Sequence, residues 1–369
     1  MRKIDNQQSN DKASILYRLN RTLINNKDRR EHMEKRMLGK IDFGGSVIGF
    51  GGIPIQRITD DEGIEVVKAC LESGINFIDT ARGYGKSEEV IGKAIGGNRN
   101  QWVLATKSMA RDYEGMKKDI EISLTNFQTE VIDLYQLHNV RKIEEYEEIM
   151  GENGAYKALK EAKEAGKIRA IGFTGHDVDM AERAVDSKKF ASIQFPYNIV
   201  ESQGEKVFEK AKKEGIGVIV MKPLAGGALD DGTLAIKYIL NNPNISVIIP
   251  GMDSIEQVRE NASVPAKDYG LTNKEQERIE EIQRKLGNRF CRRCGYCAPC
   301  AVGIDIPAQF LMEGYYTRYN LKEWAKTRYD ALDKKASDCI KCGICEPKCP
   351  YDLPIREMLE EVQEVMDKA

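Results

Sequence analysis

The sequence lacks the features that mark membrane, secreted and nucleic-acid-binding proteins. No apolar run approaches the roughly 18 residues that a membrane-spanning helix needs, and the first residues do not form a secretion signal. Charge of one sign is also missing, because 56 Lys and Arg against 58 Asp and Glu leave a net charge of −2. That balance argues against a surface for nucleic acid or anionic lipid. We therefore expect a cytoplasmic protein with no membrane and no nucleic-acid partner.

Histidine is scarce as well, with three in the chain, whereas cysteine is crowded into one region. Of the nine cysteines, eight lie between Cys291 and Cys349, and only Cys70 stands elsewhere. In a chain without a secretion signal, such crowding predicts metal ligands in a reducing compartment and not disulfides. Cys70 follows two valines in a helical pattern, so we expect it to be a small, buried apolar side chain.

The 369 residues suit two domains of ordinary size, and 41% hydrophobic residues can bury a sizeable core. Residues 1–32 form a polar, locally basic arm, which is either a simple accessory segment or a docking helix. A capping box, Thr272 followed by Glu275, predicts a helix just before the cysteine region. We therefore place one domain at residues 33–285 and a second at residues 286–369.

Short β-branched runs alternate with helical segments through the first domain. The eight runs lie near residues 47–50, 75–78, 102–105, 131–137, 168–173, 192–195, 217–221 and 246–249. Apolar strands that alternate with helices indicate a parallel sheet that is covered on both faces. Eight such units predict an α/β fold of the (β/α)8 TIM-barrel type, and the alternative is an open, doubly wound sheet.

The cysteines form two motifs that repeat within the second domain. The second motif is Cys339-x2-Cys342-x2-Cys345-x3-Cys349-Pro350, the spacing that bacterial ferredoxins use for [4Fe–4S] clusters. The first motif is one residue shorter, and the segment between the two is helical in pattern. The domain thus resembles the α-helical two-cluster ferredoxins.

That resemblance implies two [4Fe–4S] clusters, with the fourth cysteine of each motif bound to the other cluster. The expected ligand sets are Cys291, Cys294, Cys297 and Cys349 for one cluster, and Cys339, Cys342, Cys345 and Cys300 for the other. The alternative is a pair of structural zinc sites, each held by four cysteines.

Polar residues stand where the predicted barrel strands end, which is where barrel enzymes place their active sites. Asp79 and Tyr84 follow the second strand, Lys107 the third and His138 the fourth. Each residue alone is ordinary at a strand end. Four such residues on three consecutive strands predict a catalytic group.

These residues stand in runs that resemble the aldo-keto reductases. The matching runs are 78–85, 105–107 and 132–138, followed in family order by 171–174, Gln194 and 223–224. The resemblance spans residues 33–285, and with the cysteine region the chain resembles the ferredoxin-fused branch of that family. It implies that a small-molecule carbonyl compound is reduced, or an alcohol oxidised, by hydride and proton transfer.

The resemblance also implies a role for each strand-end residue. Tyr84 would donate the proton to the carbonyl oxygen. Lys107, kept charged and oriented by Asp79, would lower the pKa of Tyr84 because a nearby cation favours the phenolate. His138 would hydrogen-bond the substrate oxygen and set its orientation.

A nicotinamide cofactor, NAD(H) or NADP(H), follows from the same resemblance. Thr174 and Gln194 would hold its carboxamide, while Glu260 and Asn261 stand at the adenine-contacting positions. Met221 takes the place of the aromatic residue that stacks on the nicotinamide in the family. The stretch after the eighth strand supplies no cation for a 2′-phosphate, which argues against a preference for NADP.

The two predicted halves handle electrons differently, since a cluster passes one electron and a nicotinamide passes two as hydride. Three arrangements remain open: clusters that feed a substrate or an additional flavin, clusters that exchange electrons with a ferredoxin-like partner, and purely structural clusters. A redox-sensing or electron-relay module with an inactive, nucleotide-holding barrel is the alternative to an enzyme.

Overall fold

The computed structural model describes residues 33–265, 269–293 and 295–369, so the arm at 1–32 and Cys294 lie outside the described residues. Eight parallel strands follow one another side by side in the order of the chain. They are β3 (Gly49–Gly51), β4 (Phe77–Asp79), β5 (Val103–Ser108), β6 (Ile132–Leu137), β7 (Ile168–Thr174), β8 (Ser192–Pro196), β9 (Gly217–Met221) and β10 (Val247–Ile249).

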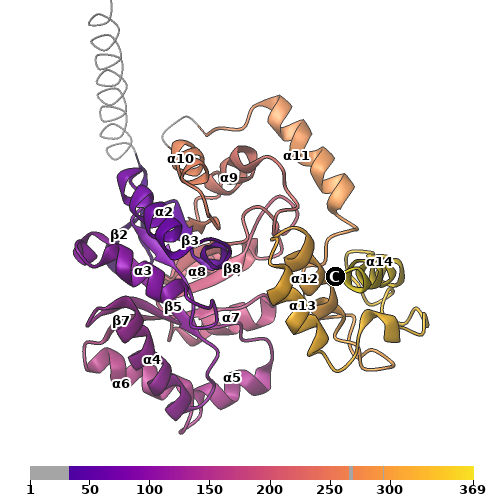
Figure 1. Ribbon diagram of the computed structural model, residues 1–369, viewed down its shortest axis with the longest axis horizontal. Coiled ribbons are helices and arrows are strands. Elements are labelled where there is room, and N and C mark those ends of the chain that lie inside the picture. Colours follow the sequence, from indigo (N-terminus) through magenta and orange to yellow (C-terminus); the bar gives the residue numbers. More distant parts are fainter. Residues whose placement is uncertain (1–32, 266–268, 294) are drawn as a thin grey trace, which may run out of the picture.

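Two parallel bridges, Ile48 with Ile248 and Gly51 with Gly251, join the first strand to the last. The sheet therefore forms a nearly closed barrel, as Figure 1 shows, which confirms the predicted (β/α)8 architecture. The alternative of an open sheet is wrong. A hairpin of β1 (Lys35–Leu38) and β2 (Ile41–Ser46) precedes the barrel, and buried Leu38 belongs to the apolar cluster that fills its interior.

Helices cover the outside of the barrel. They are α2 (Asp60–Glu72), α3 (Ser87–Ile95), α4 (Tyr113–Phe127), α5 (Ile143–Met150), α6 (Ala155–Glu164), α7 (Val178–Ser187), α8 (Glu205–Glu214), α9 (Gly232–Leu240) and α10 (Ile255–Ser263), with α11 (Asn273–Leu286) leading to the second domain. Short 3-10 turns lie at η1 (Ile53–Arg57) and η2 (Arg99–Gln101). The predicted capping box of Thr272 and Glu275 opens α11, and Cys70 is fully buried on α2.

The second domain is mainly helical and has a core of its own. It contains α12 (Ile306–Thr317), α13 (Lys322–Asp330), the 3-10 turn η3 (Ala336–Asp338) and α14 (Ile355–Asp367). Its core combines apolar residues of α12 and α14 with three buried motif cysteines, Cys297, Cys345 and Cys349. In Figure 1, α12 and α13 lie against the barrel, and α14 lies farther out.

The second domain is anchored on loops at the carboxyl end of the barrel strands. Arg57 Nη1 donates to the backbone oxygen of Tyr319 at 2.5 Å, and Arg318 Nε donates to that of Gly226 at 3.3 Å. Arg293 Nη2 pairs with Oε1 of the fully buried Glu201 at 2.5 Å. The domain therefore covers the end of the barrel where the predicted catalytic residues stand.

A buried carboxylate holds the loop between β4 and α3, which carries Tyr84. Glu88, 1% exposed, accepts hydrogen bonds from Arg82 at 2.8 Å and from Thr106 Oγ1 at 2.7 Å. It also accepts from Ser123 Oγ at 2.9 Å. Glu88 thus ties the Tyr84 loop to β5 and α4.

Replacing Glu88 by Ala is expected to lower the free energy of unfolding by about 3 kcal/mol, because it leaves buried hydroxyls and Arg82 without their acceptor. Thermal unfolding of the intact holoprotein, followed by circular dichroism, measures the effect. The neighbouring Glu89→Ala is the matched control, since Glu89 is exposed. Equal midpoints for the two variants would contradict the anchoring role of Glu88.

Candidate active site

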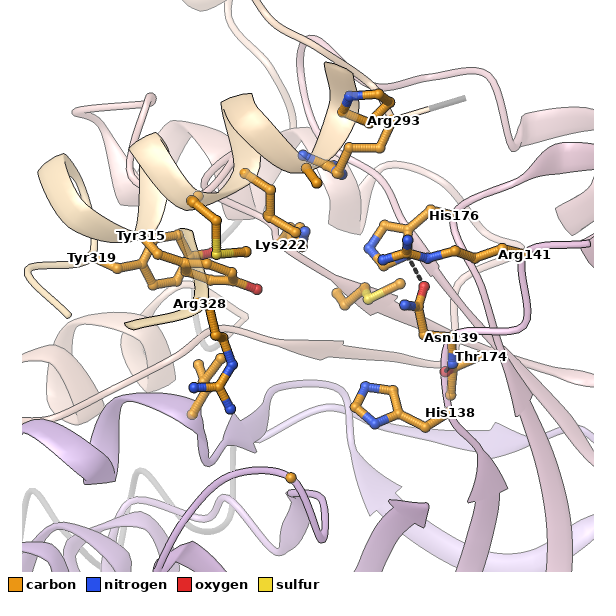
Figure 2. A pocket seen from close by; sticks show the side chains of 18 of the residues that line it. His138, Asn139, Arg141, Thr174, His176, Lys222, Arg293, Tyr315, Tyr319 and Arg328 are labelled. Atoms are coloured by element: carbon orange, nitrogen blue, oxygen red, sulfur yellow. Dashed lines mark hydrogen bonds between the residues drawn. The ribbon is translucent and has the colours of Figure 1, made fainter. Parts of the chain in front are cut away.

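A cavity of about 1,020 Å³ opens at the carboxyl end of the barrel, between the barrel and the second domain (Figure 2). All four predicted catalytic residues and three of the five predicted cofactor contacts line it. They are Asp79, Tyr84, Lys107, His138, Thr174, Gln194 and Met221. The strand ends of one barrel face are therefore brought together, as their places in the sequence predict.

Asp79 and Lys107 form an ion pair at the floor of the cavity. Each is 2% exposed, and Lys107 Nζ lies 2.5 Å from Asp79 Oδ1. Lys107 also donates to the backbone oxygen of Thr80 at 2.8 Å. Burial lowers the pKa of Lys107, whereas the negative charge of Asp79 opposes that shift. Asp79 therefore keeps a buried ammonium charged beneath the cavity.

Two glutamines complete the surroundings of Asp79. Gln136 Nε2 donates to Asp79 Oδ2 at 2.9 Å, and Gln194 Nε2 donates to Oδ1 at 3.0 Å. Gln136 was not predicted as a site residue from the sequence, although it lies on β6 two residues before His138, which directly follows that strand. Period-two spacing, continued by one residue beyond β6, places both residues toward the same side of the sheet.

Tyr84 is half-buried beside Lys107, whose Nζ lies 5.0 Å from the centre of the phenol ring. The pKa of Tyr84 is raised, first by burial, then by the negative charge of Asp79 and by Tyr319. This differs from the expectation that Lys107 lowers the pKa, because loss of water around the phenol outweighs the cation. The phenol is therefore held in its protonated form, the form that can donate a proton.

His138 stands edge-on to Tyr84, with ring centres 5.9 Å apart and an interplanar angle of 88°. Burial lowers the pKa of His138 well below its ordinary value, and the charges of Lys107 and Arg111 lower it further. Within the described residues, its buried Nδ1 has no hydrogen-bond partner. His138 is thus a neutral imidazole next to the phenol.

The predicted nicotinamide contacts divide into two groups. The Nε2–H of Gln194 donates a hydrogen bond to Asp79, and the buried Oε1 of Gln194 has no partner among the described residues. This oxygen can therefore accept a hydrogen bond from the NH2 of a carboxamide. Thr174 Oγ1 accepts from the backbone N–H of Asn139 at 2.8 Å and keeps its own hydrogen to donate. Glu260 and Asn261 lie on α10, outside the residues that line the cavity.

One wall of the cavity comes from the second domain and was not predicted from the sequence. Tyr315 on α12, Tyr319 just after the end of α12, and Trp324 and Arg328 on α13 line the same space as Tyr84. The three aromatic side chains form what we call the aromatic wall. The ring centre of Tyr315 lies 5.1 Å from that of Tyr319 and 4.9 Å from that of Trp324. The four-residue spacing of the two tyrosines suits one helix face. In the structure α12 ends at Thr317, and nothing in the spacing says what the two rings cover.

The cysteine motifs reach the cavity too, since Cys297 and Cys300 are among the residues that line it. None of the motif cysteines that the structure describes forms a disulfide, and all of these except the exposed Cys342 lie in or against one apolar core, so the donor set suits thiolate-bound clusters. Among the described residues, no three Cys, His, Asp or Glu side chains are placed to hold a metal ion.

Two profiles of known families match the chain. That of the aldo/keto reductase family matches residues 40–233, more than half of the chain, and that of the 4Fe-4S dicluster domain matches residues 290–354. Among the helices in the described ranges, none is long and apolar enough to cross a bilayer.

Similar proteins span the barrel. L-galactose dehydrogenase of Arabidopsis thaliana is 27% identical over 306 residues, covering 69% of this chain and 94% of that protein. The holo form of aldo-keto reductase AKR11C1 from Bacillus halodurans is 28% identical, with a TM-score of 0.59 over 68% of this chain and 96% of that one. An aldo-keto reductase from Klebsiella pneumoniae in complex with NADPH, 24% identical, shares the fold with a TM-score of 0.59 over 68% and 95% of the two chains.

Proposed function

Because the chain belongs to the aldo/keto reductase family and carries a 4Fe-4S dicluster domain, we propose that it is an iron–sulfur oxidoreductase that interconverts a carbonyl compound and an alcohol. One observation carries the proposal. The Asp79–Lys107 pair, Tyr84 and His138 line a single cavity, and Cys297 and Cys300 line the same cavity. The proposed proton-transfer groups and two proposed cluster ligands would thus face the same compound in this cavity.

The reaction would divide between the cofactor and the side chains. A nicotinamide cofactor, when bound, supplies or accepts the hydride. Thr174 and Gln194 would hold its carboxamide, and half-buried Met221 would contact the ring. Glu260 and Asn261 stay predicted contacts for the adenine end. The choice of NAD(H) or NADP(H) rests on the stretch after β10, which argues against NADP.

The protein's own residues would handle the proton and the charge. The Tyr84 phenol donates its proton to the carbonyl oxygen as negative charge develops there. Lys107, fixed by Asp79, stabilises the phenolate that remains. Neutral His138 donates a hydrogen bond to the same oxygen and orients the substrate. The aromatic wall from α12 and α13 limits the access of water.

The placement of the two cysteine motifs supports an electron path through the dicluster domain. Cys297 and Cys300 of the first motif line the cavity, whereas Cys342 of the second is exposed. Ile340 and Ile344 beside it are 62% and 51% exposed. This arrangement suits exchange of electrons between a ferredoxin-like partner at the second motif and a compound in the cavity.

A redox-sensing or electron-relay module with little carbonyl reductase activity is the second candidate. Met221 favours it, because this side chain replaces the aromatic that stacks on nicotinamide in the family. The buried ion pair of Asp79 and Lys107 beside Tyr84 opposes it, since a barrel that only holds nucleotide has no need of a buried charge below a phenol.

Anaerobic titration of the holoprotein with NADH and with NADPH, with and without a carbonyl compound, separates the candidates. Without a carbonyl compound, we expect the two electrons of each reduced nicotinamide to bleach the cluster absorbance. With one present, we expect it to be consumed in step with the reduced nicotinamide. Bleaching without consumption of any of a panel of aldehydes and ketones would favour the relay module. If neither occurs, the proposed oxidoreductase is wrong.

A further inference from the structure

The cavity is strongly positive. Eight of the described residues that line it are Lys or Arg, and three are Asp. The three acids already have partners: Asp79 binds Lys107, while Asp177 and Asp305 accept from the first turns of α7 and α12. The acidic side chains that line the cavity therefore leave most of its positive charge unneutralised.

Some of the cations are neutralised from outside the cavity. Arg57, Arg293 and Arg318 form ion pairs with Asp253, Glu201 and Glu313 respectively. Within the described part of the chain, no carboxylate lies within 4 Å of the charged groups of Arg141, Lys222 or Arg328, which also line the cavity. Lys222 directly follows Met221 and so belongs to the predicted nicotinamide side. Arg141 and Arg328 do not.

Arg328 is held in place by stacking. Its guanidinium carbon lies 3.7 Å from the centre of a Trp324 ring, and Trp324 packs edge-on against Tyr315. Stacking on an indole fixes the plane of an arginine while its N–H groups stay available for hydrogen bonds. Figure 2 shows Arg328 and His138 reaching into the same space from the two domains.

Arg141 is positioned by a chain of hydrogen bonds from the barrel. A guanidinium can only donate, so the Asn139 oxygen faces Arg141, at 3.0 Å from Nε and 3.1 Å from an Nη atom. The Asn139 nitrogen then donates to His176 Nδ1 at 3.1 Å. Burial lowers the pKa of His176 well below its ordinary value, so this ring is neutral and accepts the bond.

Both arginines lie within electrostatic reach of Tyr315, from different sides of the cavity (Figure 2). Burial raises the pKa of Tyr315 to about 12, and the charges of Arg293, Arg328 and Arg141 counter that rise. Tyr84 raises it further, so Tyr315 lies within electrostatic reach of the predicted proton donor as well as of both arginines. Because Arg328 and Tyr84 line the same cavity, an anionic group at Arg328 can belong to a compound whose other end lies at Tyr84.

We propose that the substrate is a carbonyl compound carrying an anionic group, such as a carboxylate or phosphate, and that Arg328 binds that group, with Arg141 adding positive charge across the cavity, while the aromatic wall contacts its apolar body. The inference rests on the proposed function, because it takes Tyr84 and His138 as the carbonyl site. The planar fork of arginine matches the oxygens of a carboxylate or phosphate in two parallel hydrogen bonds.

The test compares 4-carboxybenzaldehyde with its methyl ester, which share ring and aldehyde and differ in charge. In the anaerobic holoprotein we expect kcat/KM for the acid to exceed that for the ester by at least about tenfold. Arg328→Met should remove this preference by lowering kcat/KM for the acid alone, and Arg328→Lys should restore part of it. Lys326→Met, on the same helix and paired with Asp330, is the control that should change neither. Equal values for acid and ester in the unsubstituted protein would overturn the inference.

A binding measurement needs no reaction. Because the chain has two tryptophans, Trp102→Phe leaves Trp324 as the reporter of the cavity wall. We expect 4-methylbenzoate to change the fluorescence of Trp324 with a Kd at least about tenfold below that of methyl 4-methylbenzoate. Arg328→Met should abolish this difference in Kd. Selective binding of the acid without reduction of either aldehyde would refute the proposed reaction and leave the anion site standing. Reduction of both aldehydes with equal binding would refute the anion site alone.

Discussion

Replacing Tyr84 by Phe is expected to lower kcat/KM for carbonyl reduction by about 10² to 10⁴, the range for loss of a positioned general acid. The change removes one oxygen and keeps the ring that faces His138 and Lys107. Steady-state consumption of reduced nicotinamide measures the loss. Binding of the cofactor, followed by its own fluorescence, should stay as it was, because Thr174 and Gln194 are untouched.

Tyr156→Phe is the matched control, since this exposed hydroxyl donates to the backbone oxygen of Lys189 outside the cavity. Unchanged turnover in Tyr84→Phe would refute the proton-donor role. Loss of cofactor binding together with turnover would instead make Tyr84 a structural contact.

The pH dependence gives Tyr84 a second, independent readout. Burial and Asp79 raise its pKa above the ordinary value of about 10, so the phenol keeps its proton through the neutral and mildly alkaline range. We therefore expect kcat/KM for reduction to stay level from about pH 7 to pH 10, while alcohol oxidation, which needs the phenolate, rises with pH. The low pKa of His138 keeps that ring neutral over the same range. If kcat/KM for reduction already fell as the pH rose from 7 to 9, and Tyr84→Phe removed that fall, this assignment would be contradicted.

The barrel and its catalytic face could be predicted because both follow from local patterns. Alternating strands and helices of regular length leave few alternatives to a parallel barrel, and parallel strands bring all their carboxyl ends to one face. Asp79, Lys107 and His138 therefore had to be neighbours once β4, β5 and β6 were assigned. The family matches confirm the resemblance drawn from these residues and from the cysteine spacing.

The far wall of the cavity could not be predicted, because it depends on how two domains pack. Nothing in the spacing of Tyr315, Trp324 and Arg328 says that they face Tyr84. Their placement follows from contacts between distant segments, such as Arg57 with the backbone of Tyr319. The raised pKa of Tyr84 has the same origin, since the desolvation that causes it depends partly on this covering domain.

The assignment of the cysteines to two clusters with crossed ligands predicts how much iron each cysteine variant loses. The neighbourhood of Arg292 is consistent with it: this buried guanidinium lies 4.0 Å from the ring centre of Tyr351. Burial lowers the pKa of Arg292, and Tyr351, Glu201, Cys349 and Cys291 counter that shift. The last cysteine of the second motif and the first cysteine of the first motif thus both lie within electrostatic reach of Arg292. Two-cluster ferredoxins share their ligands in this crossed manner.

Iron analysis of paired alanine variants tests the crossed ligand sets. The unsubstituted protein should hold about eight irons, and Cys291→Ala and Cys349→Ala should each lose about four. If both cysteines bind one cluster, the double variant C291A/C349A loses no more than either single variant. C291A/C345A, in contrast, should lose both clusters, because it removes one ligand from each set. A C291A/C349A protein without iron, together with a C345A/C349A protein that keeps about four, would place Cys349 in the cluster of its own motif. A preparation that holds only zinc would refute the clusters altogether.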